Sequence, residues 1–214
     1  MKKNIIISLM LSSAMFIGCD NILDKQPLDS FTNDNFWTKE ANVEMYANYF
    51  YAEWTGYGNA GGSGDFYYPT LNDNQVGASF TTFTKSVPGN SGTWNACYTE
   101  IRRANIMIEK IPGISAMDDA TKNNWIGIAR LYRAWQHYCL VRTFGDCVWV
   151  DKALDVTAED KEQYLYAARQ DRDAVMDHIL EDLNFAVANI TKNASSRTAY
   201  NAAVAQAMKA EICL

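Results

Sequence analysis

Residues 123–144 read NNWIGIARLYRAWQHYCLVRTF and are followed by Gly145-Asp146. In a helix that turns about 100° per residue, the apolar side chains of this stretch fall on two adjacent stripes. The first stripe contains Trp125, Ile128, Ala129, Tyr132 and Cys139, and the second contains Leu131, Ala134, Trp135, Tyr138 and Val141. Apolar residues around more than half of the circumference require neighbouring helices on two sides. We therefore predict the central helix of an all-α stack, ended by Gly145 in a left-handed conformation.

The polar residues of this helix have two predicted roles. Arg130, Arg133 and His137 share the remaining narrow face, which we interpret as a surface or an interface rather than a catalytic site. Arg142 lies among the apolar residues, and its planar guanidinium predicts a structural pair with a carboxylate or a loop carbonyl. The alternative for Arg142 is a contact with a ligand.

Four further segments have helical periodicity, near residues 34–54, 94–111, 170–190 and 197–214. Asn105 lies on the apolar stripe of the second segment, which predicts a buried amide bonded to loop backbone. Glu181 and Asp182 are interpreted as part of a solvent-facing side of the third segment. The last segment has a predicted small-residue face that lets another helix approach closely, formed by Ala199, Ala202, Ala203, Ala207 and Ala210. The segment after Asp146 is predicted to be extended.

Composition excludes several classes of function. The chain has 214 residues, and its 48% hydrophobic content is enough to form the core of one domain. Its net charge is −6 and it contains no run of lysine or arginine, so we expect no nucleic-acid binding. Only two histidines are present and no nucleophile, phosphate-loop or zinc-protease motif occurs. We therefore expect neither enzymatic activity nor a cofactor or metal.

The first residues have the pattern of an export signal. Lys2 and Lys3 precede an apolar run at residues 5–17, which is shorter than the roughly 20 residues needed to cross a bilayer. Phe16-Ile17-Gly18-Cys19 resembles a bacterial lipobox, in which the cysteine becomes acylated. We predict a signal peptide at residues 1–18, a lipid anchor at Cys19 and a tether at residues 19–32. The alternative is an ordinary signal peptide with a chance cysteine.

Residues 56–92 contain eight of the chain's twelve glycines, together with many aromatic and amide side chains. An irregular segment of this length is typically functional or disordered, and its aromatic content argues against disorder. Rings stack on the C–H faces of sugars while amides and carboxylates bind the hydroxyls, so this loop suits a glycan. The predicted ligand-binding residues are Trp54, Asp65, Tyr67, Tyr68 and Asn72. The alternative is that the rings only fix the loop to the helices.

Several runs together resemble the N-terminal part of the SusD/RagB family of nutrient-binding lipoproteins. They are DNILDKQP after Cys19, FTNDNFW from residue 31, WNACYTEIRRANIMIEKIPG from residue 94, ARLYRAWQHYCLVRTFGD from residue 129, DAVMDHILEDLNFAVANI from residue 173 and RTAYNAAVAQAMKAEICL from residue 197. The resemblance implies that residues 33–214 form a domain of stacked, tetratricopeptide-like helical hairpins with a long irregular Gly/aromatic loop.

The resemblance also implies a function. Such a protein is lipid-anchored in the outer membrane, faces the exterior, captures an oligo- or polysaccharide or in some cases a peptide, and passes it to a SusC-like TonB-dependent transporter. The alternative is a helical scaffold lipoprotein that binds only a protein partner. Because family chains are longer, we expect this chain to be truncated within an interior helix, to lack part of the binding site, and to be unstable or self-associating alone.

Overall fold

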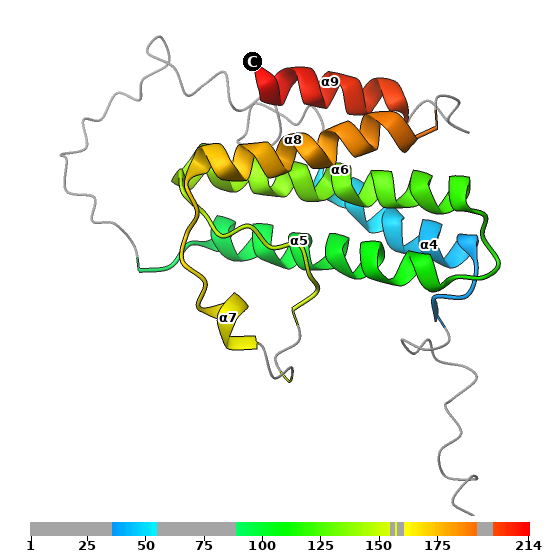
Figure 1. Ribbon diagram of the computed structural model, residues 1–214, viewed down its shortest axis with the longest axis horizontal. Helices are drawn as coiled ribbons and strands as arrows, with labels where there is room; N and C mark the ends of the chain where they lie inside the picture. Colours follow the sequence, from blue (N-terminus) through cyan, green and yellow to red (C-terminus); the bar gives the residue numbers. More distant parts are fainter. Residues whose placement is uncertain (1–35, 55–88, 155–156, 158–160, 192–198) are drawn as a thin grey trace, which may run out of the picture. The chain divides into compact units, whose positions relative to one another are not determined.

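Helix α6 (Asp119–Phe144) has neighbours on both sides, as its two apolar stripes predict (Figure 1). The computed structural model describes residues 36–54, 89–154, 157, 161–191 and 199–214. Helix α6 packs against α5 (Gly92–Lys110) and α8 (Arg172–Asn189), and α9 (Ala202–Cys213) packs on α8. The described residues contain helices and one isolated β-bridge, which confirms the all-α prediction. None of the described helices is both long and apolar enough to span a bilayer.

Both ends of α6 follow from local sequence. Asp118 caps the start, where its carboxylate accepts a hydrogen bond of 2.7 Å from the Thr121 N–H. Gly145 ends the helix with a φ of 74°, a conformation that favours glycine, and its N–H donates to the Val141 carbonyl at 2.9 Å. The predicted glycine stop is therefore confirmed, while the helix begins four residues earlier than position 123.

The interface between α6 and α8 is close at one point. Gly127 of α6 is buried, and a Cβ atom added there would lie 2.9 Å from Cγ1 of Ile190. Real Cβ atoms do not approach a neighbour so closely, so only glycine fits here without a shift of the Ile190 side chain.

The chain before residue 54 covers another side of α6. Helix α4 (Glu40–Ala47) continues directly into the 3-10 helix η2 (Asn48–Glu53), which together correspond to the predicted helix near residues 34–54. Phe50 is fully buried and stacks on Tyr132 of α6, with ring centroids 4.2 Å apart. This aromatic pair fixes the first helical segment to the centre of the stack.

Residues 147–154, named the strap below, connect α6 to the short helix α7 (Lys161–Leu165). Cys147 forms an antiparallel bridge with Gln170, and the rest of the strap has no regular secondary structure, so the predicted extended conformation is seen only at this bridge. Helix α5 ends in the 3-10 turn η4 (Ile111–Gly113), close to the predicted end of that segment at residue 111. Helix α7 was not predicted.

Two predictions for single helix faces are wrong. In α9 the buried residues are Ala202, Ala205, Met208 and Ile212, while Ala203, Ala207 and Ala210 are exposed. The helix starts later than predicted because Asn201 caps it through the Val204 N–H, and the larger side chains of Met208 and Ile212 occupy the buried face in place of these alanines. Arg142 is exposed, lies 5.6 Å from the Tyr138 ring, and pairs with no carboxylate or loop carbonyl in the described part of the chain. The last turn of α6, where it lies, is less covered than the middle.

Candidate functional site

Two tryptophans mark the ends of the predicted ligand-binding loop, and both contact α6. Trp54 follows η2, and Trp94 lies in the first turn of α5. The Trp54 ring lies 5.1 Å from that of Trp135, and the Trp94 ring lies 5.2 Å from that of Phe144. The segment between them therefore leaves and rejoins the helical stack from positions fixed by aromatic contacts.

Trp54 is the one predicted ligand-binding residue that the structure describes, and it is half-buried. Its indole N–H donates to the Tyr200 hydroxyl, and Tyr200 in turn lies against Tyr51, with ring centroids 4.5 Å apart. Burial raises the pKa of Tyr200 above its usual range, so the hydroxyl stays protonated. Trp54 thus joins the first helical segment to the residues just before α9. Its role in ligand binding stays a prediction.

The other predicted site residues lie outside the described residues. These are Cys19 at the predicted anchor and Asp65, Tyr67, Tyr68 and Asn72 in the Gly/aromatic loop. The predicted signal peptide at residues 1–18 and the predicted tether at residues 19–32 also lie outside them.

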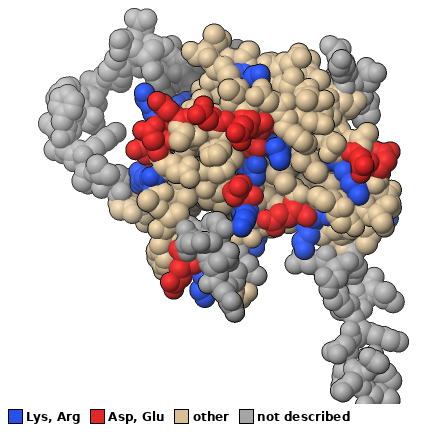
Figure 2. Space-filling model, in the orientation of Figure 1, with Lys and Arg blue, Asp and Glu red and all other residues tan. Residues whose placement is uncertain are grey.

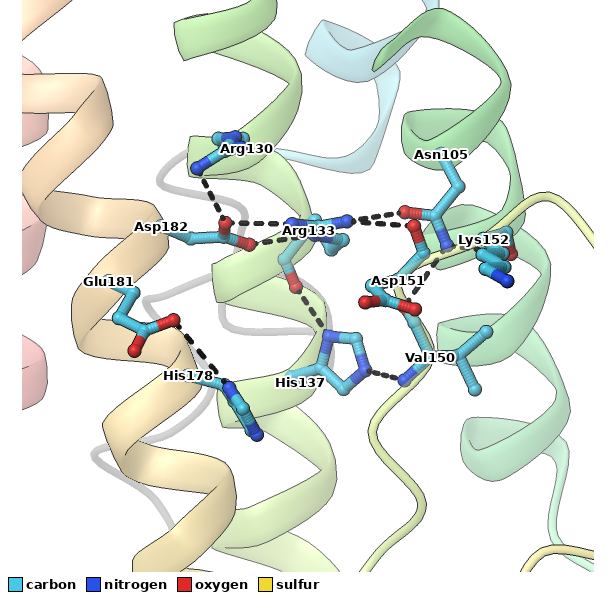
Figure 3. A network of polar contacts seen from close by, with 10 residues as sticks. All are labelled: Asn105, Arg130, Arg133, His137, Val150, Asp151, Lys152, His178, Glu181 and Asp182. Carbon is cyan, nitrogen blue, oxygen red and sulfur yellow. Dashed lines mark hydrogen bonds and ion pairs between the residues drawn. The ribbon is translucent and has the colours of Figure 1, made fainter. Parts of the chain in front are cut away.

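A buried polar network crosses the centre of the stack (Figure 3). Arg133 of α6 is 5% exposed and donates from Nε and Nη2 to the two carboxylate oxygens of Asp182 on α8, at 2.7 and 2.8 Å. Its Nη1 donates to Oδ1 of Asn105 on α5 at 2.8 Å and to the Asp151 carbonyl of the strap at 3.3 Å. One guanidinium therefore connects three helices and the strap, and its charge is balanced by a buried carboxylate.

The same network fixes the strap. Asn105 donates from Nδ2 to the carbonyls of Val150 and Lys152, both at 3.0 Å, which confirms its prediction as a buried amide bonded to loop backbone. The Tyr98 hydroxyl donates to the Val148 carbonyl at 2.9 Å and accepts from the Val148 N–H at 3.0 Å. The strap thus replaces missing sheet partners with side chains of α5.

His137 is completely buried beside this network. Its Nε2 accepts a hydrogen bond of 3.3 Å from the Val150 N–H, so the ring proton is on Nδ1, which lies 3.0 Å from the Arg133 carbonyl. Burial lowers the pKa of His137 to about 3, and the nearby Arg133 charge acts in the same direction. The imidazole is therefore neutral at physiological pH and serves as a structural acceptor.

The interpretation of Arg133 and His137 as surface or interface residues is wrong, and so is that of Asp182 as solvent-facing, since Asp182 is 2% exposed. The reason is that these polar groups satisfy one another, which makes burial tolerable. One signal was present in the sequence. Asp182 is three residues after Ile179 and one before Leu183, so helical spacing places it beside the core stripe of α8.

Two cavities lie on either side of the strap, and Val148 and Ala167 line both. The charged cavity, of about 640 Å³, is bounded by α6, the strap and α8, and its principal side chains are Arg130, Arg133, Trp149, Asp151, His178 and Glu181. The aromatic cavity, of about 630 Å³, is bounded by α5, the strap and α7, and its principal side chains are Trp94, Tyr98, Arg102, Leu154, Leu165 and Arg169. Both volumes are typical of small-ligand sites.

No group of three His, Cys, Asp or Glu side chains that could hold a metal ion occurs among the residues described. On the face shown in Figure 2, acidic and basic side chains are intermixed, and no continuous basic surface is present. The arrangement provides hydrogen-bonding and stacking groups around open cavities, on a rigid helical support.

The fold defines a protein of stacked, antiparallel helices that carries open binding cavities. A family model described as SusD-like, "Starch-binding associating with outer membrane", matches residues 12–212. The chain belongs to this SusD-like family.

Curated relatives support the same assignment. A SusD-like protein of Bacteroides ovatus is 23% identical over 201 residues, which are 89% of this chain and 35% of the relative. SusD-like protein P38 of Formosa agariphila is 25% identical over 214 residues, which are 92% of this chain and 39% of the relative. The chain therefore spans well under half the length of these relatives.

Solved structures show the same fold. A SusD-like protein from Bacteroides fragilis superposes with a TM-score of 0.63 at 24% identity, covering 88% of this chain and 37% of that structure. A SusD-like carbohydrate-binding protein from the same species gives a TM-score of 0.60 at 16% identity, covering 83% and 37%. A laminarin-binding SusD-like protein gives a TM-score of 0.50 at 22% identity, covering 57% and 26%.

Proposed function

We propose that this chain belongs to a cell-surface lipoprotein that binds glycans and passes them, without chemical change, to a SusC-like TonB-dependent transporter. The observation that carries the proposal is the family match over residues 12–212, whose description names starch binding and the outer membrane. Solved members of the fold include a laminarin-binding protein, which supports a polysaccharide as the ligand class. A peptide is the second ligand class to test.

The proposed glycan site is the Gly/aromatic loop between the two tryptophans. Trp54 and Trp94 fix the ends of this segment on α6, so ring side chains within it would be presented from a rigid support. Asp65, Tyr67, Tyr68 and Asn72, with Trp54, would supply the stacking faces and planar hydrogen-bonding groups that a sugar requires.

The proposed anchor is Cys19. Acyl chains on this cysteine would hold the protein at the outer membrane facing the exterior, with residues 19–32 as the tether. Replacing Cys19 with Ala would then release the protein from the membrane fraction. Unchanged membrane retention of the variant would contradict lipidation.

Titration calorimetry against a panel of polysaccharides and peptides tests the binding function. We expect saturable binding of a glycan, with affinity reduced by Tyr67→Ala and by Tyr68→Ala. Tyr166→Ala is a matched control, because Tyr166 is 82% exposed on the described surface and outside the loop. Equal affinities for all variants would show that the loop rings only pack. Absence of any ligand together with retained transporter binding would support a helical scaffold instead.

A further inference from the structure

The charged cavity contains a guanidinium whose hydrogen bonds are incomplete. Nη1 of Arg130 forms an ion pair with Oδ1 of Asp182 at 3.7 Å, which is longer than a hydrogen bond, and both Asp182 oxygens already accept hydrogen bonds from Arg133. Nε of Arg130 is buried and has no hydrogen-bond partner among the described residues. Its guanidinium carbon lies 4.2 Å from the centroid of the Phe185 ring, which holds the group in place. Arg130 is therefore a fixed donor without its own acceptor.

Carboxylates line the same cavity. The backbone carbonyl of Asp151 in the strap accepts a hydrogen bond from Arg133. The exposed carboxylate of Asp151 has no hydrogen-bond partner in the described ranges. Oε2 of Glu181 on α8 lies 3.7 Å from Nδ1 of His178, and the Glu181 side chain is 75% exposed. In Figure 3, Asp151 and Glu181 come from opposite sides of the Arg133 network, one from the strap and one from α8.

The charges of the lining residues define the ligand. Asp182 accepts its hydrogen bonds from Arg133 and makes only a longer ion pair with Arg130, which leaves the Arg130 guanidinium to donate to an anion and Asp151 and Glu181 as acceptors for cationic groups. An uncharged sugar would leave the Arg130 donor without a charged acceptor, and a simple anion would add to the surplus of carboxylates. A ligand with one carboxylate and two ammonium groups balances the lining.

We propose that the charged cavity binds a free α-amino acid with a basic side chain, with the ligand carboxylate on Arg130 and its ammonium groups on Asp151 and Glu181. The described residues that line this cavity come from outside residues 56–92, so the proposal is tested independently of glycan binding. Its volume of about 640 Å³ accommodates lysine or arginine together with bridging water.

Calorimetry with matched ligands tests which groups are recognised. We expect L-lysine to bind the full chain saturably. Cadaverine lacks the carboxylate and 6-aminohexanoate lacks the α-ammonium, so each should bind at least about tenfold more weakly, as expected for loss of a charged hydrogen bond. L-glutamate should bind more weakly than L-lysine. Cadaverine binding as tightly as L-lysine, or no saturable L-lysine binding, would overturn the proposal.

Variants locate the site. Arg130→Gln and Asp151→Asn should each weaken L-lysine binding about tenfold or more, whereas Arg172→Gln should not, since Arg172 is 69% exposed and away from the cavity. The Nε–H resonance of Arg130 in a nitrogen-15 spectrum should shift on addition of L-lysine to the wild-type chain, which shows the contact without any substitution. An unshifted Arg130 resonance at saturating L-lysine, or equal affinity in Arg130→Gln, would contradict this site.

Discussion

Arg133 of α6 and Asp182 of α8 form a two-pronged ion pair in the interior, with donor–acceptor distances of 2.7 and 2.8 Å. Each partner makes the burial of the other tolerable, because an unpaired interior charge is strongly unfavourable. The pair also lies across the interface between α6 and α8. It therefore ties the two central helices together in one register.

Asp182→Asn should lower the free energy of unfolding by about 3 kcal/mol or more, because Arg133 would keep a buried charge without a counter-ion. Urea unfolding measures this change. The matched control is Asp173→Asn, which breaks the exposed pair with Arg172 and should cost no more than about 1 kcal/mol. Similar losses in the free energy of unfolding for both variants would mean that the buried ion pair contributes no more to stability than the exposed pair.

Acid should destabilise the fold through His137. Its pKa is about 3 in the folded chain and roughly 6.5 when unfolded, so between these values only the unfolded state binds the proton. The contribution of His137 to stability is therefore complete above about pH 6.5 and is lost as the pH falls towards 3, by at most about 1.4 kcal/mol per pH unit. Urea unfolding at a series of pH values should give a flatter profile for His137→Gln. Identical pH profiles for both proteins would count against this role.

Tyr98→Phe should loosen the strap while leaving the helices intact. The substitution removes both hydrogen bonds to Val148, which should cost about 1–3 kcal/mol for the groups left unpaired. In the variant, the Val148 amide should exchange its hydrogen faster than in the wild-type chain, whereas exchange of the α6 amides should not change. Tyr166→Phe is the control, because Tyr166 is largely exposed. An unchanged Val148 exchange rate would show that the strap is held by other contacts.

Gly127→Val should separate α6 from α8. Even the first side-chain carbon would lie 2.9 Å from Ile190, and overpacking of this kind costs about 1–3 kcal/mol. Gly113→Val is a comparison at a position where no atom lies within 4 Å of the added carbon. Thermal unfolding of both variants measures how much stability each substitution removes. A larger loss of stability for Gly113→Val than for Gly127→Val would contradict the close approach of Gly127 to Ile190.

The helical periodicity of the sequence predicts the helices well, because burial of apolar stripes largely determines them. The centre of α6, its Gly145 stop and the helix predicted near residues 170–190 are all found where the pattern places them. The start of α9 was misplaced because a single capping residue, Asn201, determines where this short helix begins. Helix α7 was missed since five residues carry too little periodicity to indicate a helix.

The polar network could not be predicted from periodicity. Whether Arg133 is exposed or buried depends on Asp182, which is 49 residues away, and only the packing of α6 on α8 brings them together. Asn105 was predicted correctly because an amide within an otherwise apolar stripe has few alternatives to a backbone partner. The charged cavity depends on the same packing and on the strap, so no local motif could reveal it.

The strap forms a common wall, since Val148 lines the cavities on both of its sides. A molecule that shifts this wall from one side necessarily reshapes the space on the other. Occupancy of one compartment then alters affinity in the second, and thermodynamic reciprocity requires the converse effect to have equal size. Communication between two ligands would thus need no movement of the helices, only displacement of eight residues held by side-chain hydrogen bonds.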